Sequence, residues 1–241
     1  MLVAVVVLLT LAGCSSQKAM EAVPFVVSSE EADAYHAVMF DGGASDYENR
    51  EFTKEGVFAA IFDAYNDVTR YYVWGYNDEE RTGEWQWELK PDDTSDLPAN
   101  GSLITVTATL TASEDALDHY WLTQISDISV KTSYSGYKCD YDLTVMSPTL
   151  QRVEIQNILY KKEAFEGKTV AIVGRAHVHD ETHGDHVHHE TNIINPYNEE
   201  MWEIAVESED AFPESETMVI VTGTIADGVI TDATVSETDL F

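Results

Sequence analysis

The chain has 241 residues, of which 44 are acidic and 13 are basic, so its formal net charge is −31. This length suits one large domain or two small ones, and a hydrophobic content of 44% is enough for a packed core. The charge argues against nucleic acid as a partner, because basic side chains supply most of the affinity for phosphates. Two cysteines, Cys14 and Cys139, are too few for a framework of disulfides.

The N-terminal segment has the pattern of a secretory signal peptide. Residues 2–11 form an apolar run, which is about half the length of roughly 20 residues that a helix needs to cross a bilayer. Such a run is typical of a secretory signal peptide. It ends in Leu11-Ala12-Gly13-Cys14, which resembles the lipobox of bacterial lipoproteins. The resemblance implies a signal peptide over residues 1–13, a diacylglycerol on Cys14, a tether over 14–25, and an extracytoplasmic protein that this lipid anchors to the cell membrane.

Ten short segments rich in β-branched and aromatic residues predict β-strands. They cover 57–62, 70–76, 85–89, 103–111 and 120–130 in the first half, and 169–179, 186–194, 201–206, 217–225 and 229–235 in the second. Only 30–39 and 149–160 are predicted as helices. Five strands in about 75 residues suit a small closed barrel, which leaves no exposed sheet edges. The chain is therefore expected to be mainly β.

The sequence also contains an internal repeat. With a shift of 115 positions, residues 87–110 align without gaps on residues 202–225, and six of the 24 pairs are identical. The alignment begins with Trp87 on Trp202, and the apolar positions correspond throughout. Shared order, spacing and hydrophobicity favour a duplication that produced two related domains.

Two segments of the second half carry a resemblance to a family. The sequence FEGKTVAIVG at 165–174, followed by VIVTGT at 219–224, is similar to the tandem OB-fold-like domains of uncharacterised bacterial lipoproteins of the Gram-positive type. The resemblance implies two small OB-like five-stranded β-barrels after the signal peptide. The first would cover 26–130 and the second 149–241, with a linker over 131–148. It implies a fold and a location, and no activity.

Histidines are concentrated in one place. Six of the eight lie within thirteen positions, where His-Val-His at 177–179 is followed, after six residues, by His-Val-His at 186–188. This palindrome predicts a β-hairpin that turns at Gly184. The expected cross-strand pairs are His179 with His186 and His177 with His188.

In such a hairpin the four imidazoles share one face, because alternate residues of a strand point the same way. Imidazoles from two neighbouring strands can chelate Zn²⁺ at Zn–N distances of about 2.0–2.1 Å. Copper and nickel are alternatives, because imidazole suits both. The expected ligands are His177, His179, His186 and His188. Additional ligands or orienting groups are expected from His183, His189, Asp180, Asp185 and Glu190.

The sequence therefore predicts a non-enzymatic, lipid-anchored binding protein whose hairpin binds a transition metal, of which zinc is the favoured candidate. One alternative is a surface lipoprotein that binds a protein or a glycan and has no metal role. Eight aromatic residues in the first half fit either a sugar-stacking platform on the first barrel or, as is more usual for such residues, packing in the core and at its edges: Tyr71, Tyr72, Trp74, Tyr76, Trp85, Trp87, Tyr120 and Trp121. A second alternative is a zinc-dependent hydrolase, in which three histidines leave a position for water and Glu190 or Asp180 is the base.

Overall fold

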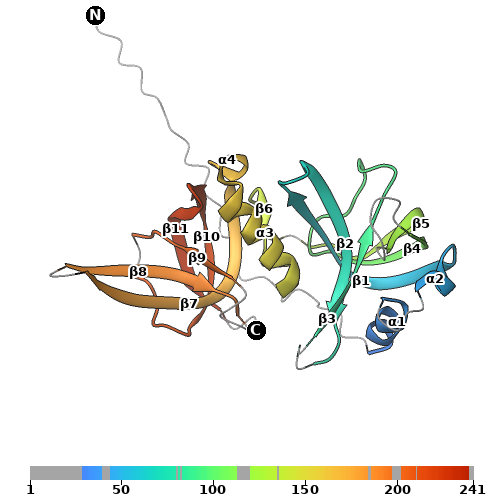
Figure 1. The fold of residues 1–241 in the computed structure, drawn as a ribbon, viewed down its shortest axis with the longest axis horizontal. Coiled ribbons are helices and arrows are strands. Elements are labelled where there is room, and N and C mark those ends of the chain that lie inside the picture. The colour runs from blue at the N-terminus through green and yellow to red at the C-terminus, as the bar shows by residue number, and fades with distance from the viewer. Residues whose placement is uncertain are drawn as a thin grey trace, which may run out of the picture.

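The computed structural model describes residues 29–39, 44–79, 81, 83–112, 120–134, 136–183, 186–196, 202–209 and 211–238 (Figure 1). The predicted signal peptide, the tether and Cys14 lie outside these residues. Within the described part of the chain, no helix is long and apolar enough to cross a membrane.

The chain is mainly β, as its sequence predicts, and all ten predicted strands are present. The first sheet contains β1 (Glu51–Asp63), β2 (Val68–Tyr76), β3 (Glu84–Leu89), β4 (Leu103–Ala112) and β5 (Tyr120–Thr132). The second contains β6 (Tyr141–Asp142), β7 (Thr169–His183), β8 (His186–Ile194), β9 (Glu203–Ala205), β10 (Met218–Ala226) and β11 (Val229–Glu237).

The two sheets have the same pairing order. In the first, β1 pairs with β2 and β4, β2 with β3, β4 with β5, and Leu89 of β3 pairs in parallel with Leu122 of β5. In the second, β7 pairs with β8 and β10, β8 with β9, and β10 with β11. A parallel bridge between Val206 and Ile230 then connects the end of β9 to β11. Each strand from β1 to β5 thus has a counterpart from β7 to β11.

The helices follow the same repeat. Helices α1 (Ser29–Met39) and α2 (Ala44–Tyr47) precede β1, and helices α3 (Pro148–Tyr160) and α4 (Lys162–Phe165) precede β7. The repeated unit is therefore a long helix, a short helix and five strands. This shared order supports the duplication that the sequence predicts.

A contact between a glycine and a tryptophan occurs in both units and shows which residues correspond. A Cβ added to Gly56 of β1 would lie 2.8 Å from the Cη2 atom of Trp85, and one added to Gly174 of β7 would lie 3.1 Å from the same atom of Trp202. Each glycine leaves room for an indole ring from the third strand region of its own sheet. Trp202 thus takes the place of Trp85, and the predicted match of Trp202 with Trp87 is wrong by two residues.

The reason for this error is a length difference between the two units. Gly56 pairs with Ile104 and Gly174 pairs with Val219, so the fourth strands do keep the offset of 115. The third strands have an offset of 117, because the connection to the fourth strand is two residues shorter in the second unit. An ungapped alignment cannot detect this, since a slip of two residues keeps every side chain on its own face of a strand.

Helix α3 lies between the two sheets (Figure 1). Ser147 caps it by accepting a hydrogen bond from the backbone N–H of Leu150 at 3.2 Å, and Pro148 begins the first turn, where its missing N–H costs nothing. Its buried residues are Leu150, Gln151, Glu154, Ile155, Asn157 and Ile158. Three of these six are polar, so partners for them must come from the neighbouring elements.

Those partners include residues of the first sheet. Asn157 donates a hydrogen bond to the carbonyl oxygen of Phe62 at 2.9 Å. Near the start of α3, Glu84 of β3 accepts hydrogen bonds from the Ser147 hydroxyl and the Thr149 N–H, both at 3.2 Å. The apolar core is also continuous here, because buried side chains of β1 and β2 belong to the same cluster as those of α3 and the second sheet.

The segment 131–148, predicted as a linker, contributes to the second sheet and its core. Strand β6 pairs in parallel with β7 through Tyr141 and Asp142. The side chains of Leu143, Val145 and Met146 are buried directly after it. The segment is therefore part of the second sheet and its core.

Candidate functional site

The histidine-rich segment forms a ribbon of two strands, but its register differs from the predicted one. The ladder pairs His183 with His186, Glu181 with His188, His179 with Glu190 and His177 with Asn192. The predicted pairs, His179 with His186 and His177 with His188, are therefore wrong by four residues. The strands continue until only Gly184 and Asp185 separate them, and Gly-Asp is a typical sequence for a two-residue hairpin connection.

In the observed register the expected ligand positions still share one face of the ribbon, but they no longer lie opposite one another. A shift of four residues is even, so alternation places positions 177, 179, 181 and 183 on the same face of the ribbon as 186, 188, 190 and 192. His186 lies opposite His183, six residues or about 20 Å along the strand from His177, while His179 and His188 are two positions apart. One ion cannot bridge the separation of His177 from His186 with Zn–N bonds of about 2 Å.

The remaining predicted positions fall in three places. His183 lies in the outermost pair, next to the connection, on the shared face. Asp180 pairs with His189, and these two positions belong to the opposite face, with Val178 and Val187. Asp185 lies outside the described residues. The side chains of 179–183 and 186–190 are not described either. Among the side chains that are, no group of three His, Cys, Asp or Glu residues could hold a metal.

The base of the ribbon is fixed by polar contacts. The Ser215 hydroxyl makes two hydrogen bonds with the backbone of Val178. It accepts from the Val178 N–H at 2.9 Å and donates to the Val178 carbonyl oxygen at 3.2 Å. On the other strand, the Asn192 side chain donates to Glu203 at 2.7 Å. Strand β10 pairs with β7 only as far as Arg175, so in the described ladders the outer part of β7 pairs with β8 alone (Figure 1). The ribbon therefore extends beyond the rest of the sheet.

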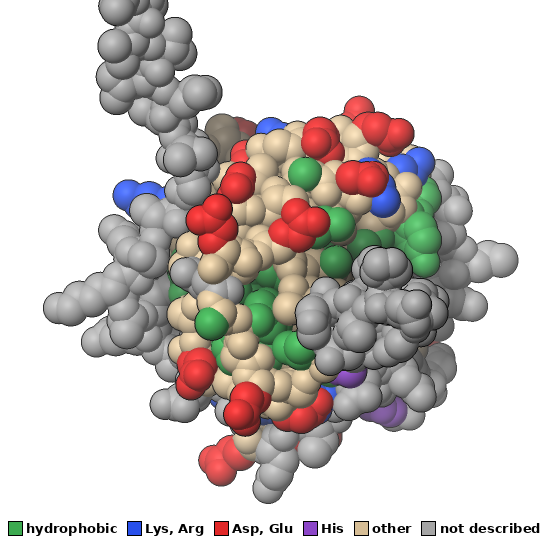
Figure 2. All heavy atoms as spheres, turned by 90° about the vertical axis from the view of Figure 1, so that its left-hand side faces the viewer, with side chains coloured by type: hydrophobic (Ala, Val, Ile, Leu, Met, Phe, Trp, Pro, Cys, Tyr) green, Lys and Arg blue, Asp and Glu red, His purple; other side chains and the backbone are tan. Residues whose placement is uncertain are grey.

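The surroundings of the ribbon are acidic. Figure 2 views the molecule from the end formed by the second sheet, and Asp and Glu side chains are distributed across this face while few Lys and Arg side chains appear. Carboxylates at such a surface raise the local concentration of cations.

Four of the eight aromatic residues considered for a sugar platform belong to the core. Trp74, Tyr76, Trp85 and Trp87 are at most 1% exposed, so they cannot stack on a ligand at the surface. The side chains of Tyr120 and Trp121 are not described. Tyr71 and Tyr72 are partly buried, and both line a groove that the sequence does not predict.

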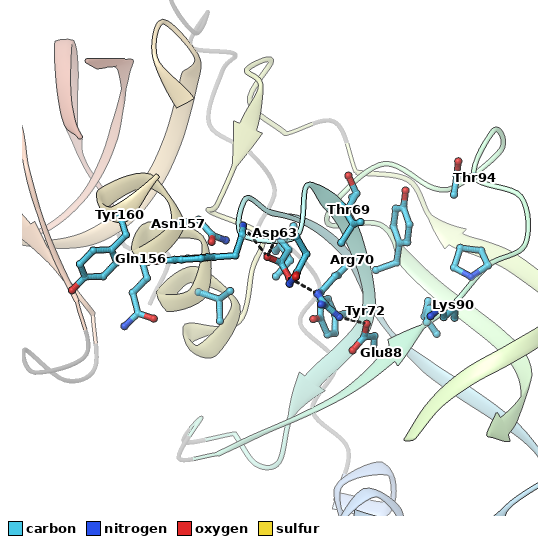
Figure 3. Close-up of a pocket in the computed structure, with 18 residues that line it drawn as sticks. Asp63, Thr69, Arg70, Tyr72, Glu88, Lys90, Thr94, Gln156, Asn157 and Tyr160 are labelled. Carbon is cyan, nitrogen blue, oxygen red and sulfur yellow. Dashed lines mark hydrogen bonds and ion pairs between the residues drawn. The ribbon is translucent and has the colours of Figure 1, made fainter. Parts of the chain in front are cut away.

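This groove runs between the first sheet and α3 and has a volume of about 1250 Å³ (Figure 3). One wall comes from the ends of β1, β2 and β3 and the loops that follow β1 and β3. The other wall is one face of α3, formed by Val153, Gln156, Asn157 and Tyr160, whose spacing of three and four residues is that of a helix face. Because the two walls lie about 90 residues apart in sequence, no local motif signals the groove.

A chain of ion pairs spans the sheet wall. Arg70 donates from Nε to Asp63 at 2.8 Å and from Nη1 to Glu88 at 3.0 Å, as the dashed lines in Figure 3 show. Asp63 also accepts from the Asn66 side chain at 2.8 Å and from two backbone N–H groups of its own turn, those of Tyr65 and Asn66. Three neighbouring elements of the wall are therefore connected through one guanidinium.

The same network fixes the protonation states in the wall. Burial raises the pKa of Asp63, but hydrogen bonds from Asn66 and Arg70 outweigh it and lower that pKa below its ordinary value. Burial lowers the pKa of Arg70, and the contacts with Asp63 and Glu88 more than reverse this. Burial and the charge of Glu88 raise the pKa of Tyr72. At neutral pH the wall thus presents charged Asp63 and Arg70 and a neutral phenol.

Comparison with known proteins adds no assignment. No family model matches the chain, and no curated protein matches it at a significant level.

Proposed function

We propose that this protein is a lipid-anchored, extracytoplasmic binding protein and that its β7–β8 ribbon binds a transition metal, with zinc as the first candidate. The observation that carries the proposal is the register, which pairs His183 directly with His186. The proposed ligands are His183, His186 and His188, with Glu181 or a water molecule in the fourth position.

Ladder geometry supports this set. Directly opposite residues of an antiparallel ladder have Cβ atoms about 4.5–5.5 Å apart, so His183 and His186 can reach one ion. His188 follows His186 by two residues on the same face, and it pairs with Glu181. Three imidazoles and one oxygen ligand suit tetrahedral Zn²⁺. The set includes two of the four ligands first expected from the sequence and replaces His177 and His179 with His183.

The proposed architecture is two OB-like barrels, each preceded by helices. Its support is the pairing order β1-β2-β3-β5-β4, which recurs from β7 to β11 and includes a parallel contact between the third and fifth strands of each unit. The anchor rests on Cys14 and the apolar run before it. A surface position would let the ribbon take metal from outside the cell.

Calorimetric titration of the full-length protein with Zn²⁺ tests the proposal. We expect one zinc per chain for the wild type, and no saturable heat for the variant with His183→Ala, His186→Ala and His188→Ala. The matched control is His177→Ala with His179→Ala, which removes the two histidines that lie on the same face six and four residues farther from the turn than His183. The control should keep the wild-type stoichiometry. If both variants bind zinc like the wild type, the ribbon is not the site.

A further inference from the structure

The groove beside α3 collects exposed apolar side chains. Among the described residues, five large hydrophobic side chains are exposed, and four of them line this groove: Tyr65, Val68, Val153 and Tyr160. The two tyrosines are the most exposed of the five, at 59% and 71%. Exposed apolar groups that gather in a concave site, with a few polar groups among them, are characteristic of binding sites.

The two rims of the groove are held in place. The ammonium group of Lys161, which follows α3, lies 4.5 Å from the centre of the Tyr65 ring in the β1–β2 loop. Asn157 of α3 donates to the carbonyl oxygen of Phe62 directly before that loop. These contacts connect the loop to the helix, so the groove exists before any ligand arrives. Preformed sites lose less conformational entropy when they bind.

The charges that line the groove cancel. Its charged residues are two acids, Asp63 and Glu88, and two bases, Arg70 and Lys90. Arg70 is occupied by both acids, so its charge is already compensated. In a chain of net charge −31, this is a locally neutral site. It offers no excess positive charge to an anionic ligand and no excess negative charge to a basic peptide.

Size and chemistry together indicate the ligand class. A volume of about 1250 Å³ exceeds the range of about 300–1,000 Å³ that is usual for one small molecule, so an elongated ligand fits better. Four tyrosines (Tyr65, Tyr71, Tyr72 and Tyr160) supply apolar ring faces with polar tips. Carboxylate, guanidinium and amide groups between them can exchange hydrogen bonds with hydroxyl groups. Sugar rings present one apolar face and a rim of hydroxyls, and so match both features.

We propose that this groove binds an uncharged oligosaccharide, whose rings stack on Tyr65 and Tyr160 at the rims and whose hydroxyls meet the Asp63–Arg70–Glu88 wall. The proposal does not depend on the metal ribbon, because the groove is built from the first sheet and α3.

The test is a binding screen with cellohexaose, maltohexaose, laminarihexaose and chitohexaose, followed by calorimetry, with EDTA present throughout. We expect saturable binding of at least one of these neutral hexasaccharides. Tyr65→Ala and Tyr160→Ala should each weaken it about tenfold, because each removes one stacking surface. Val130→Ala is the matched control, since Val130 is an exposed hydrophobic residue that lies outside the groove, and it should bind like the wild type.

Three results would overturn the proposal. The first is no binding to any of the four sugars by wild-type protein that shows a cooperative thermal transition. The second is equal weakening by Val130→Ala and the two tyrosine variants. The third is tighter binding of a charged probe, either hexagalacturonic acid or a hexalysine peptide, because the groove would then select for charge.

Discussion

The side-chain carboxylate of Glu154 accepts a hydrogen bond from the backbone N–H of Phe62 at 3.3 Å, which links α3 to the end of β1. Glu154 is fully buried, and its other oxygen accepts from the Asn157 side chain at 3.2 Å. Burial raises the pKa of Glu154 to about 7, although these hydrogen bonds oppose the rise. A group with a pKa near neutral therefore lies at the contact between α3 and the first sheet.

This contact predicts a pH-dependent stability. Because the folded-state pKa of Glu154 is raised, its contribution is complete below the ordinary value near 4.5 and is lost as the pH rises through about 7. Glu154→Gln removes this titration. Between about pH 5 and pH 8, the wild type should lose about 2.5 kcal/mol more unfolding free energy than the variant. Urea unfolding at both pH values measures the difference.

Repulsion among the many carboxylates also grows with pH, so a matched control is needed. Glu163→Gln removes one charge from an exposed position on the neighbouring helix α4. Its pH dependence should match that of the wild type. If Glu154→Gln also matches the wild type, the buried carboxylate does not titrate in this range.

The corresponding glycines of the two sheets, Gly56 and Gly174, predict a loss of stability when either is replaced by alanine. Gly56→Ala would place a Cβ 2.7 Å from the Trp74 carbonyl oxygen, and Gly174→Ala would place one 2.6 Å from that of Ile194. Because backbone cannot move aside cheaply, each change should cost about 1–3 kcal/mol or more. In Gly167→Ala the added Cβ meets nothing within 4 Å, and only the positive φ of 72° opposes it, at a cost of about 1 kcal/mol. Thermal unfolding of the three variants should rank Gly167→Ala as the mildest, and the reverse order would refute the close approach to the backbone.

Much of the fold could be predicted from the sequence, and particular residues show where prediction stopped. Strand β8 was predicted over 186–194, its observed bounds, because His-Val-His alternation and β-branched residues continue to its end. The palindrome favours pairing about a six-residue loop, but the alternation of faces permits a two-residue turn equally well, because the two registers differ by four residues, an even number. The signal that decides between them is Gly184-Asp185, which suits a two-residue turn.

The groove shows a different limit. Arg70, Asp63 and Glu88 come from three strands, and Tyr160 comes from a helix in the other half of the chain. None of them belongs to a motif, and their proximity follows from the pairing of β1, β2 and β3 and from the packing of α3. Four of the eight aromatic residues considered for a sugar platform are instead large side chains of the core, which is the more usual place for such residues.

The proposed lipid anchor predicts a change in partitioning. Cys14→Ser removes the thiol that would carry diacylglycerol, so the variant should move from the detergent phase to the aqueous phase of Triton X-114. Mass spectrometry of the wild-type N-terminal peptide should detect a modified Cys14 as its first residue. Wild-type protein that enters the aqueous phase with an unmodified cysteine would show that there is no anchor.

Zinc binding should weaken in mild acid. Imidazole binds metal only in its neutral form, and its ordinary pKa is about 6.5. With three histidine ligands, affinity should fall steeply between about pH 7.5 and pH 5.5, by more than one ligand's protonation could explain. Competition titrations against a chromophoric chelator at both pH values measure the fall. An affinity that is the same at both values would exclude histidine ligands.

Zinc K-edge X-ray absorption of the protein loaded with one equivalent of Zn²⁺ tests the central claim most directly. Three imidazoles should give Zn–N distances of about 2.0–2.1 Å together with multiple scattering from the rings. That ring scattering should disappear when His183, His186 and His188 are replaced by Ala. A spectrum without imidazole scattering in the wild type, or one that the three substitutions leave unchanged, would contradict a metal site on the ribbon.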